Sequence, residues 1–141
     1  MSESLNRWFE HPFTVFPHHT DYAGIVWHGT YLTWLEEARV ECLQSIGVAF
    51  ADFVLIGCDT PVVEMSLRYH QSLRLGDKAL VRTQMSLQGV RIKWENKIQS
   101  PDLQITYVTA AVTLVPTDRQ TGKVMRRLPP IVAETLSKIL G

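Results

Sequence analysis

Apolar residues recur at three- and four-residue spacing between positions 30 and 46, a period typical of an amphipathic helix. The helix-forming positions are Tyr31, Leu35, Ala38, Cys42 and Ile46, and Trp34 and Leu43 widen the same face. Gly47 stands where such a helix is expected to end. The apolar arc is wide for a surface helix, so we expect the rest of the chain to wrap around it.

Elsewhere the apolar positions alternate with a period of two, which predicts strands. From Val63 to Tyr69 every second residue is apolar, which predicts a half-buried strand. The residues also alternate over 91–99, while β-prone residues predict strands over 10–16 and 103–115, and a further strand is expected over 79–87. We expect short helices over 49–56 and 130–140 and a polar loop over 116–123. The short turns between the later strands favour antiparallel pairing of neighbours.

One long apolar helix and one antiparallel sheet have to bury their apolar faces against each other. We therefore predict an α+β fold in which a curved sheet wraps around a central helix. A chain of 141 residues fits a single domain over residues 1–141. Such a sheet has open edges, and pairing between subunits would cover them, so we expect a homo-oligomer.

The composition limits which kinds of binding partner and which cellular compartment we expect for this protein. Lys and Arg together number 14, as do Asp and Glu, so a nucleic-acid partner held by phosphate neutralisation is not expected. No apolar run has the length of a membrane span, and Met1 to Glu10 lacks the apolar region of a secretory signal. Cys42 and Cys58 form no CxxC motif, so we expect a cytoplasmic protein without disulfides.

The residue types best suited to catalysis are concentrated between positions 18 and 31. This segment contains three of the five histidines together with Asp21, Tyr22, Gly24, Trp27, Gly29 and Tyr31. It leads into the start of the predicted long helix, where unpaired N–H groups and the helix dipole favour negative charge. A carbonyl oxygen that gains charge during acyl transfer would be stabilised there, with Asp21 as general base or nucleophile.

Plainer interpretations of the same residues stay open. A loop aspartate beside a glycine often serves only as a turn or capping acid. His18, His19, Asp21 and His28 are residue types that bind zinc, but adjacent histidines often point to opposite faces, and no HExxH or cysteine pattern is present, so we expect no metal. Glu36, Glu37, Arg39 and Glu41 predict a solvated or subunit-facing stripe. Without a GxGxxG motif or a P-loop, we expect no cofactor.

The stretch Asp21-Tyr-Ala-Gly24-Ile-Val-Trp-His28, followed by Tyr31 and Glu37-Ala38-Arg39, resembles the signature of the 4-hydroxybenzoyl-CoA thioesterase family of hotdog-fold proteins. It is most similar to the branch of short acyl-CoA thioesterases that includes those of the Tol-Pal gene cluster. The later Pro61-Val-Val-Glu64, Tyr69 and Gly76-Asp77 also fit this family. The resemblance implies a hotdog fold, with a five- or six-stranded sheet around one long helix.

The resemblance also implies an activity and a site. An acyl- or aroyl-CoA thioester would be hydrolysed to the free acid and CoA, with Asp21 as the catalytic carboxylate. The backbone amide at or beside His28 would polarise the thioester carbonyl, and Gly24 would allow the tight turn between them. The substrate would be bound by His19, Tyr22, Gly24, Trp27, Gly29 and Tyr31. The active site would lie between two subunits of a dimer or tetramer.

Some alternatives remain at this stage. The chain could bind CoA thioesters without cleaving them, since fold does not fix function. A hotdog dehydratase would need a paired histidine and acid, for which His28 and Glu37 are the nearest candidates. His19 stands where the family often has a second acid. The acyl group is also open: the aromatic residues near Asp21 suit aromatic groups, including dihydroxynaphthoyl, as well as aliphatic chains.

Overall fold

The computed structural model describes the backbone of residues 3–4 and 8–140 and the side chains of residues 8–49 and 51–138. The first half of the chain contains β1 (Glu3–Ser4), β2 (Phe9–Thr14), the 3₁₀ helix η1 (Pro17–His19), α1 (Thr30–Gln44), α2 (Phe50–Leu55) and β3 (Cys58–Asp59). The second half contains β4 (Val62–Tyr69), β5 (Lys78–Gln88), β6 (Arg91–Gln99), β7 (Thr106–Leu114), β8 (Thr117–Asp118) and α3 (Pro130–Leu140).

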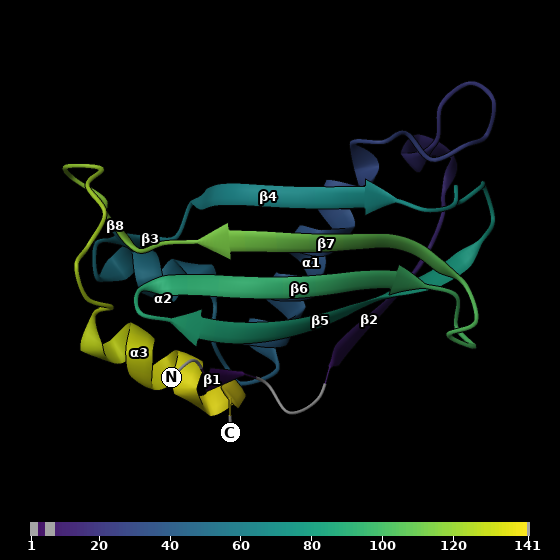
Figure 1. The fold of residues 1–141 in the computed structure, drawn as a ribbon. Coiled ribbons are helices and arrows are strands. Elements are labelled where there is room, and N and C mark those ends of the chain that lie inside the picture. The colour runs from purple at the N-terminus through teal and green to yellow at the C-terminus, as the bar shows by residue number, and fades with distance from the viewer. Residues whose placement is uncertain (1–2, 5–7, 141) are drawn as a thin grey trace.

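The main sheet is antiparallel, and its strand order is β1-β5-β6-β7-β4, with β2 also paired to β5 (Figure 1). The predicted pairing of sequence neighbours is confirmed for β5, β6 and β7, but β4 pairs with β7 and not with β5, the next strand along the chain. The hairpin between β5 and β6 turns at Gly89, whose φ of +62° lies in the left-handed region that glycine tolerates best. A second sheet pairs β3 with β8. The strand β8 lies inside the stretch 116–123, which we expected to be only a polar loop. The two strands are far apart in sequence, so no local pattern indicates this pairing.

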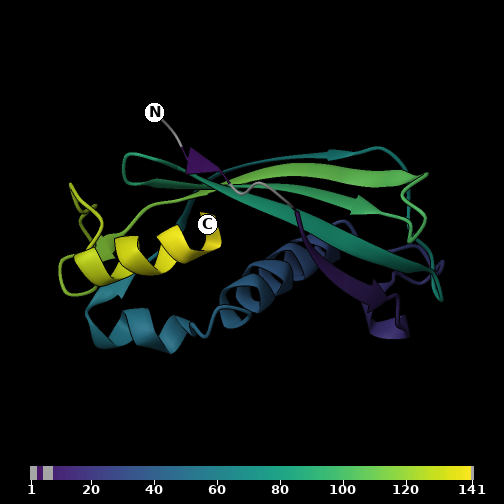
Figure 2. The ribbon, with the colours of Figure 1, turned by 90° about the horizontal axis from the view of Figure 1, so that it is seen from below.

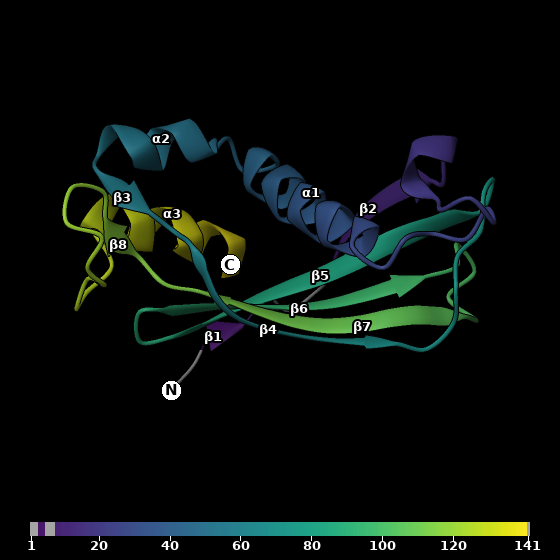
Figure 3. The ribbon, with the colours of Figure 1, turned by 90° about the horizontal axis from the view of Figure 1, so that it is seen from above.

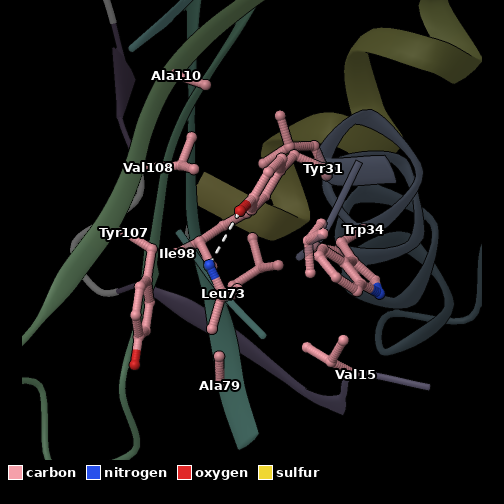
Figure 4. Packing of buried hydrophobic residues seen from close by; sticks show 13 residues of the cluster. Val15, Tyr31, Trp34, Leu73, Ala79, Ile98, Tyr107, Val108 and Ala110 are labelled. Atoms are coloured by element: carbon pink, nitrogen blue, oxygen red, sulfur yellow. Dashed lines mark hydrogen bonds between the residues drawn. The ribbon is translucent and has the colours of Figure 1, made fainter. Parts of the chain in front are cut away.

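The long helix α1 lies against one face of the curved sheet, as Figures 2 and 3 show from opposite sides. Its inner face includes Leu35 and Ala38, both fully buried. Trp34 stacks on Phe13 of β2 with ring centroids 4.0 Å apart. Tyr31 and Trp34 pack with residues from β5, β6 and β7 in the cluster of Figure 4. The predicted central helix with its wide apolar arc is confirmed.

The strand β4 departs from the prediction. A half-buried strand was expected, yet Met65 is 39% and Tyr69 50% exposed, although both share a face with buried residues of β7. The reason is position: β4 is the last strand of the sheet, and α1 packs closest to β2 and β5, at the other side. The apolar face of β4 therefore lies uncovered at a free edge of the sheet.

The far end of α1 packs with α2 and α3 in a second apolar cluster that contains both cysteines. Cys42 and Cys58 are free and buried. Burial raises the pKa of the Cys42 thiol to about 11 and also raises the pKa of Cys58, with a further contribution from the charge of Asp59. Both groups are therefore protonated thiols at neutral pH.

We expect native protein at pH 8 to react with iodoacetamide at least about a hundredfold more slowly than protein unfolded in urea. The reagent attacks the thiolate, which burial and a raised pKa make scarce. Mass spectrometry of the alkylated protein over time measures both rates. Equal rates for folded and unfolded protein would contradict the buried positions of the cysteines.

Candidate active site

The loop between η1 and α1 folds back onto the start of the helix. The carbonyl oxygen of His19 accepts the Trp27 N–H at 3.1 Å and the Thr30 hydroxyl at 3.0 Å. Thr20 and Val26 form an isolated antiparallel bridge between these two points. The backbone just before Asp21 is thereby held beside the first residues of α1.

Asp21 sits at the tip of this loop with an exposed side chain. Its Oδ1 atom accepts the N–H groups of Ala23 at 2.9 Å and Ile25 at 3.1 Å, which is an Asx-type turn. Gly24 has a φ of +76°, so the tight turn expected at this glycine is confirmed. Within the described part of the chain, the second oxygen Oδ2 accepts no hydrogen bond. The carboxylate is thus oriented through one oxygen and open through the other.

The start of α1 offers free hydrogen-bond donors. The N-cap residue is Gly29, which has no side chain to cap the helix, and the first turn contains no acidic residue. Among the residues that the structure describes, the N–H groups of His28 and Gly29 donate to no acceptor. Such unpaired donors at the positive end of a helix suit a negatively charged oxygen.

The remaining loop residues predicted for substrate binding are mostly exposed. Tyr22 is fully exposed and Trp27 is 55% exposed. The indole of Trp27 packs beside the His28 ring, with centroids 4.7 Å apart, and lies directly over Gly29. Any side chain at position 29 would collide with this indole, so Gly29 allows Trp27 to cover the helix start.

Tyr31 differs from these residues because it belongs to the core. It is 3% exposed, and its hydroxyl accepts the Leu73 N–H at 3.2 Å (Figure 4). Burial is the main reason that its pKa is raised. Its ring contacts Tyr69 edge-to-face at 5.4 Å. Both tyrosines border a cavity of about 260 Å³, which is also lined by Val26, His28, His70, Gln71 and Ser72.

Sequence reasoning missed the role of Tyr69 at this site. Its hydroxyl donates to the His28 carbonyl oxygen at 2.8 Å. The two residues are 41 positions apart, and the alternating pattern of β4 indicates only which face Tyr69 occupies.

His19 packs into an aromatic cluster rather than standing free. Its ring lies 4.0 Å from that of His18 and 4.9 Å from that of Trp34, and its Nδ1 accepts the Phe16 N–H at 2.9 Å. Burial and, next, the neighbouring His18 lower the pKa of His19. The position where the family often has a second acid is therefore occupied by a neutral ring near pH 7.

The structure does not form the residue pair that a dehydratase would need. The His28 and Glu37 pair of a dehydratase does not form, because the Glu37 carboxylate lies 3.4 Å from Nε2 of His11 on β2. Within residues 3–4 and 8–140, no three His, Cys, Asp or Glu residues are grouped so as to hold a metal ion. No helix in that part of the chain is long and apolar enough to cross a membrane.

The chain is similar in sequence to known thioesterases. The model of the thioesterase superfamily matches residues 23–111. A Synechocystis protein named "Putative esterase sll0410" is 57% identical over 134 residues, which cover 94% of this chain and 81% of that protein. The acyl-CoA thioesterase YbgC of Haemophilus influenzae is 28% identical over 115 residues, which cover 79% of this chain and 83% of the relative.

Solved structures give the same result at the level of the fold. A DHNA-CoA thioesterase of Staphylococcus aureus superposes with a TM-score of 0.83 at 25% identity, covering 94% of this chain and 90% of that one. The 1,4-dihydroxy-2-naphthoyl-CoA thioesterase Slr0204 of Synechocystis gives a TM-score of 0.84 at 20% identity, over 94% and 95% of the two chains. The fold is therefore the hotdog fold, and the chain belongs to the thioesterase superfamily of thioester hydrolases.

Proposed function

We propose that this protein hydrolyses an acyl- or aroyl-CoA thioester to the free acid and CoA, with Asp21 as the catalytic carboxylate. The observation that carries the proposal is the pairing of two features on one loop. The first feature is the Asp21 carboxylate, which is oriented through one oxygen and has the other oxygen free. The second is the start of α1, which has unpaired N–H groups and is hydrogen-bonded to the loop that carries Asp21.

The chemistry needs little more than these groups. A thioester is already activated, so one carboxylate and N–H donors at the carbonyl oxygen can suffice without a catalytic triad. Asp21 either removes a proton from the attacking water or attacks the carbonyl itself to give an anhydride that water opens. In both routes the His28 and Gly29 amides stabilise the charge that develops on the carbonyl oxygen.

We further propose that the enzyme is a homodimer or a higher oligomer built on pairing of β4 with its copy in a second subunit. The free edge of β4 and its exposed apolar face are the features that such pairing covers. An antiparallel pair of identical strands also satisfies two-fold symmetry.

Arg39 departs from its expected place on the surface of α1. It was expected in a solvated or subunit-facing stripe, but it is only 6% exposed, because it lies between Thr60 and apolar side chains such as Leu43 and Trp94. Within the described part of the chain, its Nε and Nη1 atoms have no hydrogen-bond partner. Burying unpaired guanidinium donors costs free energy.

Release of free thiol from a panel of CoA thioesters tests the proposed function. The panel contains short, medium and long aliphatic chains together with benzoyl and 1,4-dihydroxy-2-naphthoyl groups. We expect at least one ester to be cleaved at a rate proportional to enzyme concentration. A protein that binds these esters and slows their spontaneous hydrolysis is a binder, and that result rejects the proposed activity.

A further inference from the structure

The peptide unit between His28 and Gly29 is held at one end and open at the other. Its carbonyl oxygen, on His28, accepts the Tyr69 hydroxyl at 2.8 Å. Its N–H group, on Gly29, has no acceptor among the described residues. This is the same N–H group that the proposed function aims at the thioester carbonyl.

The direction of that N–H follows from the backbone. Gly29 already has helical dihedral angles, with φ −75° and ψ −22°, so its N–H points outward from the start of α1. A trans peptide is planar, and its C=O and N–H bonds point in opposite directions. Fixing the His28 carbonyl therefore fixes the direction of the Gly29 N–H.

Tyr69 is well placed to act as this anchor. It lies at the end of β4, where it is paired with Val108 of β7, and the next residue donates its N–H to the Tyr107 carbonyl at 2.8 Å. Its ring also packs edge-to-face on Tyr31, which is itself held in the core. The hydroxyl therefore reaches the loop from the sheet, and its position does not depend on the loop.

We infer that Tyr69 is a positioning residue, whose hydroxyl aligns and polarises the His28–Gly29 peptide so that the Gly29 N–H can stabilise the oxyanion. A hydrogen bond to a carbonyl oxygen polarises the whole peptide unit and strengthens its N–H as a donor. The inference rests on the proposed function. It adds a residue from β4, outside the loop and the helix, to the machinery of the reaction.

Tyr69→Phe tests the inference because it removes only the hydroxyl and leaves the ring on Tyr31. We expect kcat to fall about tenfold, less than the hundredfold or more typical of deleting an oxyanion donor itself. KM should stay within about twofold, because the charge on the oxygen develops only in the transition state. Tyr107→Phe is the matched control: it also removes a tyrosine hydroxyl, from β7, and should leave both constants unchanged.

A second readout does not depend on turnover. In a ¹H–¹⁵N spectrum of the full-length protein, the Gly29 amide should shift in Tyr69→Phe and stay in place in Tyr107→Phe, because only the first variant loses the bond to the His28 carbonyl. The melting temperatures of wild type and both variants show whether a change in rate is only a loss of folding.

The outcomes separate the inference from the proposed function. An unchanged kcat in Tyr69→Phe, or an unmoved Gly29 resonance, overturns the inference while leaving the thioesterase intact. A fall in kcat that follows a lower melting temperature, with KM altered as well, marks a structural role and also overturns it. If wild-type protein cleaves no thioester, the proposed function itself fails.

Discussion

Asp21→Asn is expected to lower kcat by at least about a hundredfold while KM and the melting temperature stay close to wild type. Removing a general base or a carboxylate nucleophile typically costs that much or more. The fold should survive because the amide oxygen of Asn can accept the same two N–H groups, from Ala23 and Ile25. Thiol release with the best substrate of the panel measures the change.

Asp118→Asn is the matched control for this variant. Asp118 ends a strand, and like Asp21 it accepts two backbone N–H groups at its Oδ1, from Gln120 and Thr121, at 2.9 and 3.0 Å. It is the last residue of β8, apart from the loop and helix start described above. Near-normal turnover in Asp21→Asn would remove Asp21 from its proposed role, whatever the control shows.

The second large effect is expected at the sheet edge. Met65→Glu places a charge on the inner face of β4, paired in register with buried Val112 of β7. In the proposed dimer this charge would be buried without a partner, which costs several kcal/mol. We therefore expect the dimer to weaken at least about a hundredfold, and activity at micromolar concentration to fall with it, because each site would lose the partner subunit.

Light scattering after size-exclusion chromatography, together with thiol release at the same concentrations, checks this expectation. Gln88→Glu is the control, because it adds the same charge at an exposed position at the end of β5. A wild-type protein that is a fully active monomer of 16.1 kDa, or a Met65→Glu variant that stays dimeric, would contradict the proposed interface.

The long helix and the four long strands could be predicted because periodic apolar positions or β-prone residues mark them in the sequence. The predicted span 30–46 compares with Thr30–Gln44 in the structure, and 91–99 with Arg91–Gln99. The turn at Gly24 was also predictable, since a positive φ there needs a residue without a Cβ.

Some features of the candidate site could be predicted from the sequence and others could not. The loop residues from Asp21 to Gly29 lie next to one another in sequence, so their approach to the helix start could be inferred from local motifs. The bond from Tyr69 to His28 joins segments that meet only because the end of β4 lies beside the residues that precede α1. The Arg39 side chain suggests exposure, yet it is buried among residues distant in sequence, such as Thr60 and Trp94.

The sequence by itself determined where the long helix and the long strands form, which of their faces are apolar, and which loop carries Asp21. These properties depend on residues within one or two turns of each other, so their pattern is legible along the chain. The tertiary structure decided that β4 is a free edge, that β3 pairs with β8, and that a tyrosine supports the helix start. Those features depend on contacts between distant segments, and alternation within one strand does not reveal which neighbour covers it.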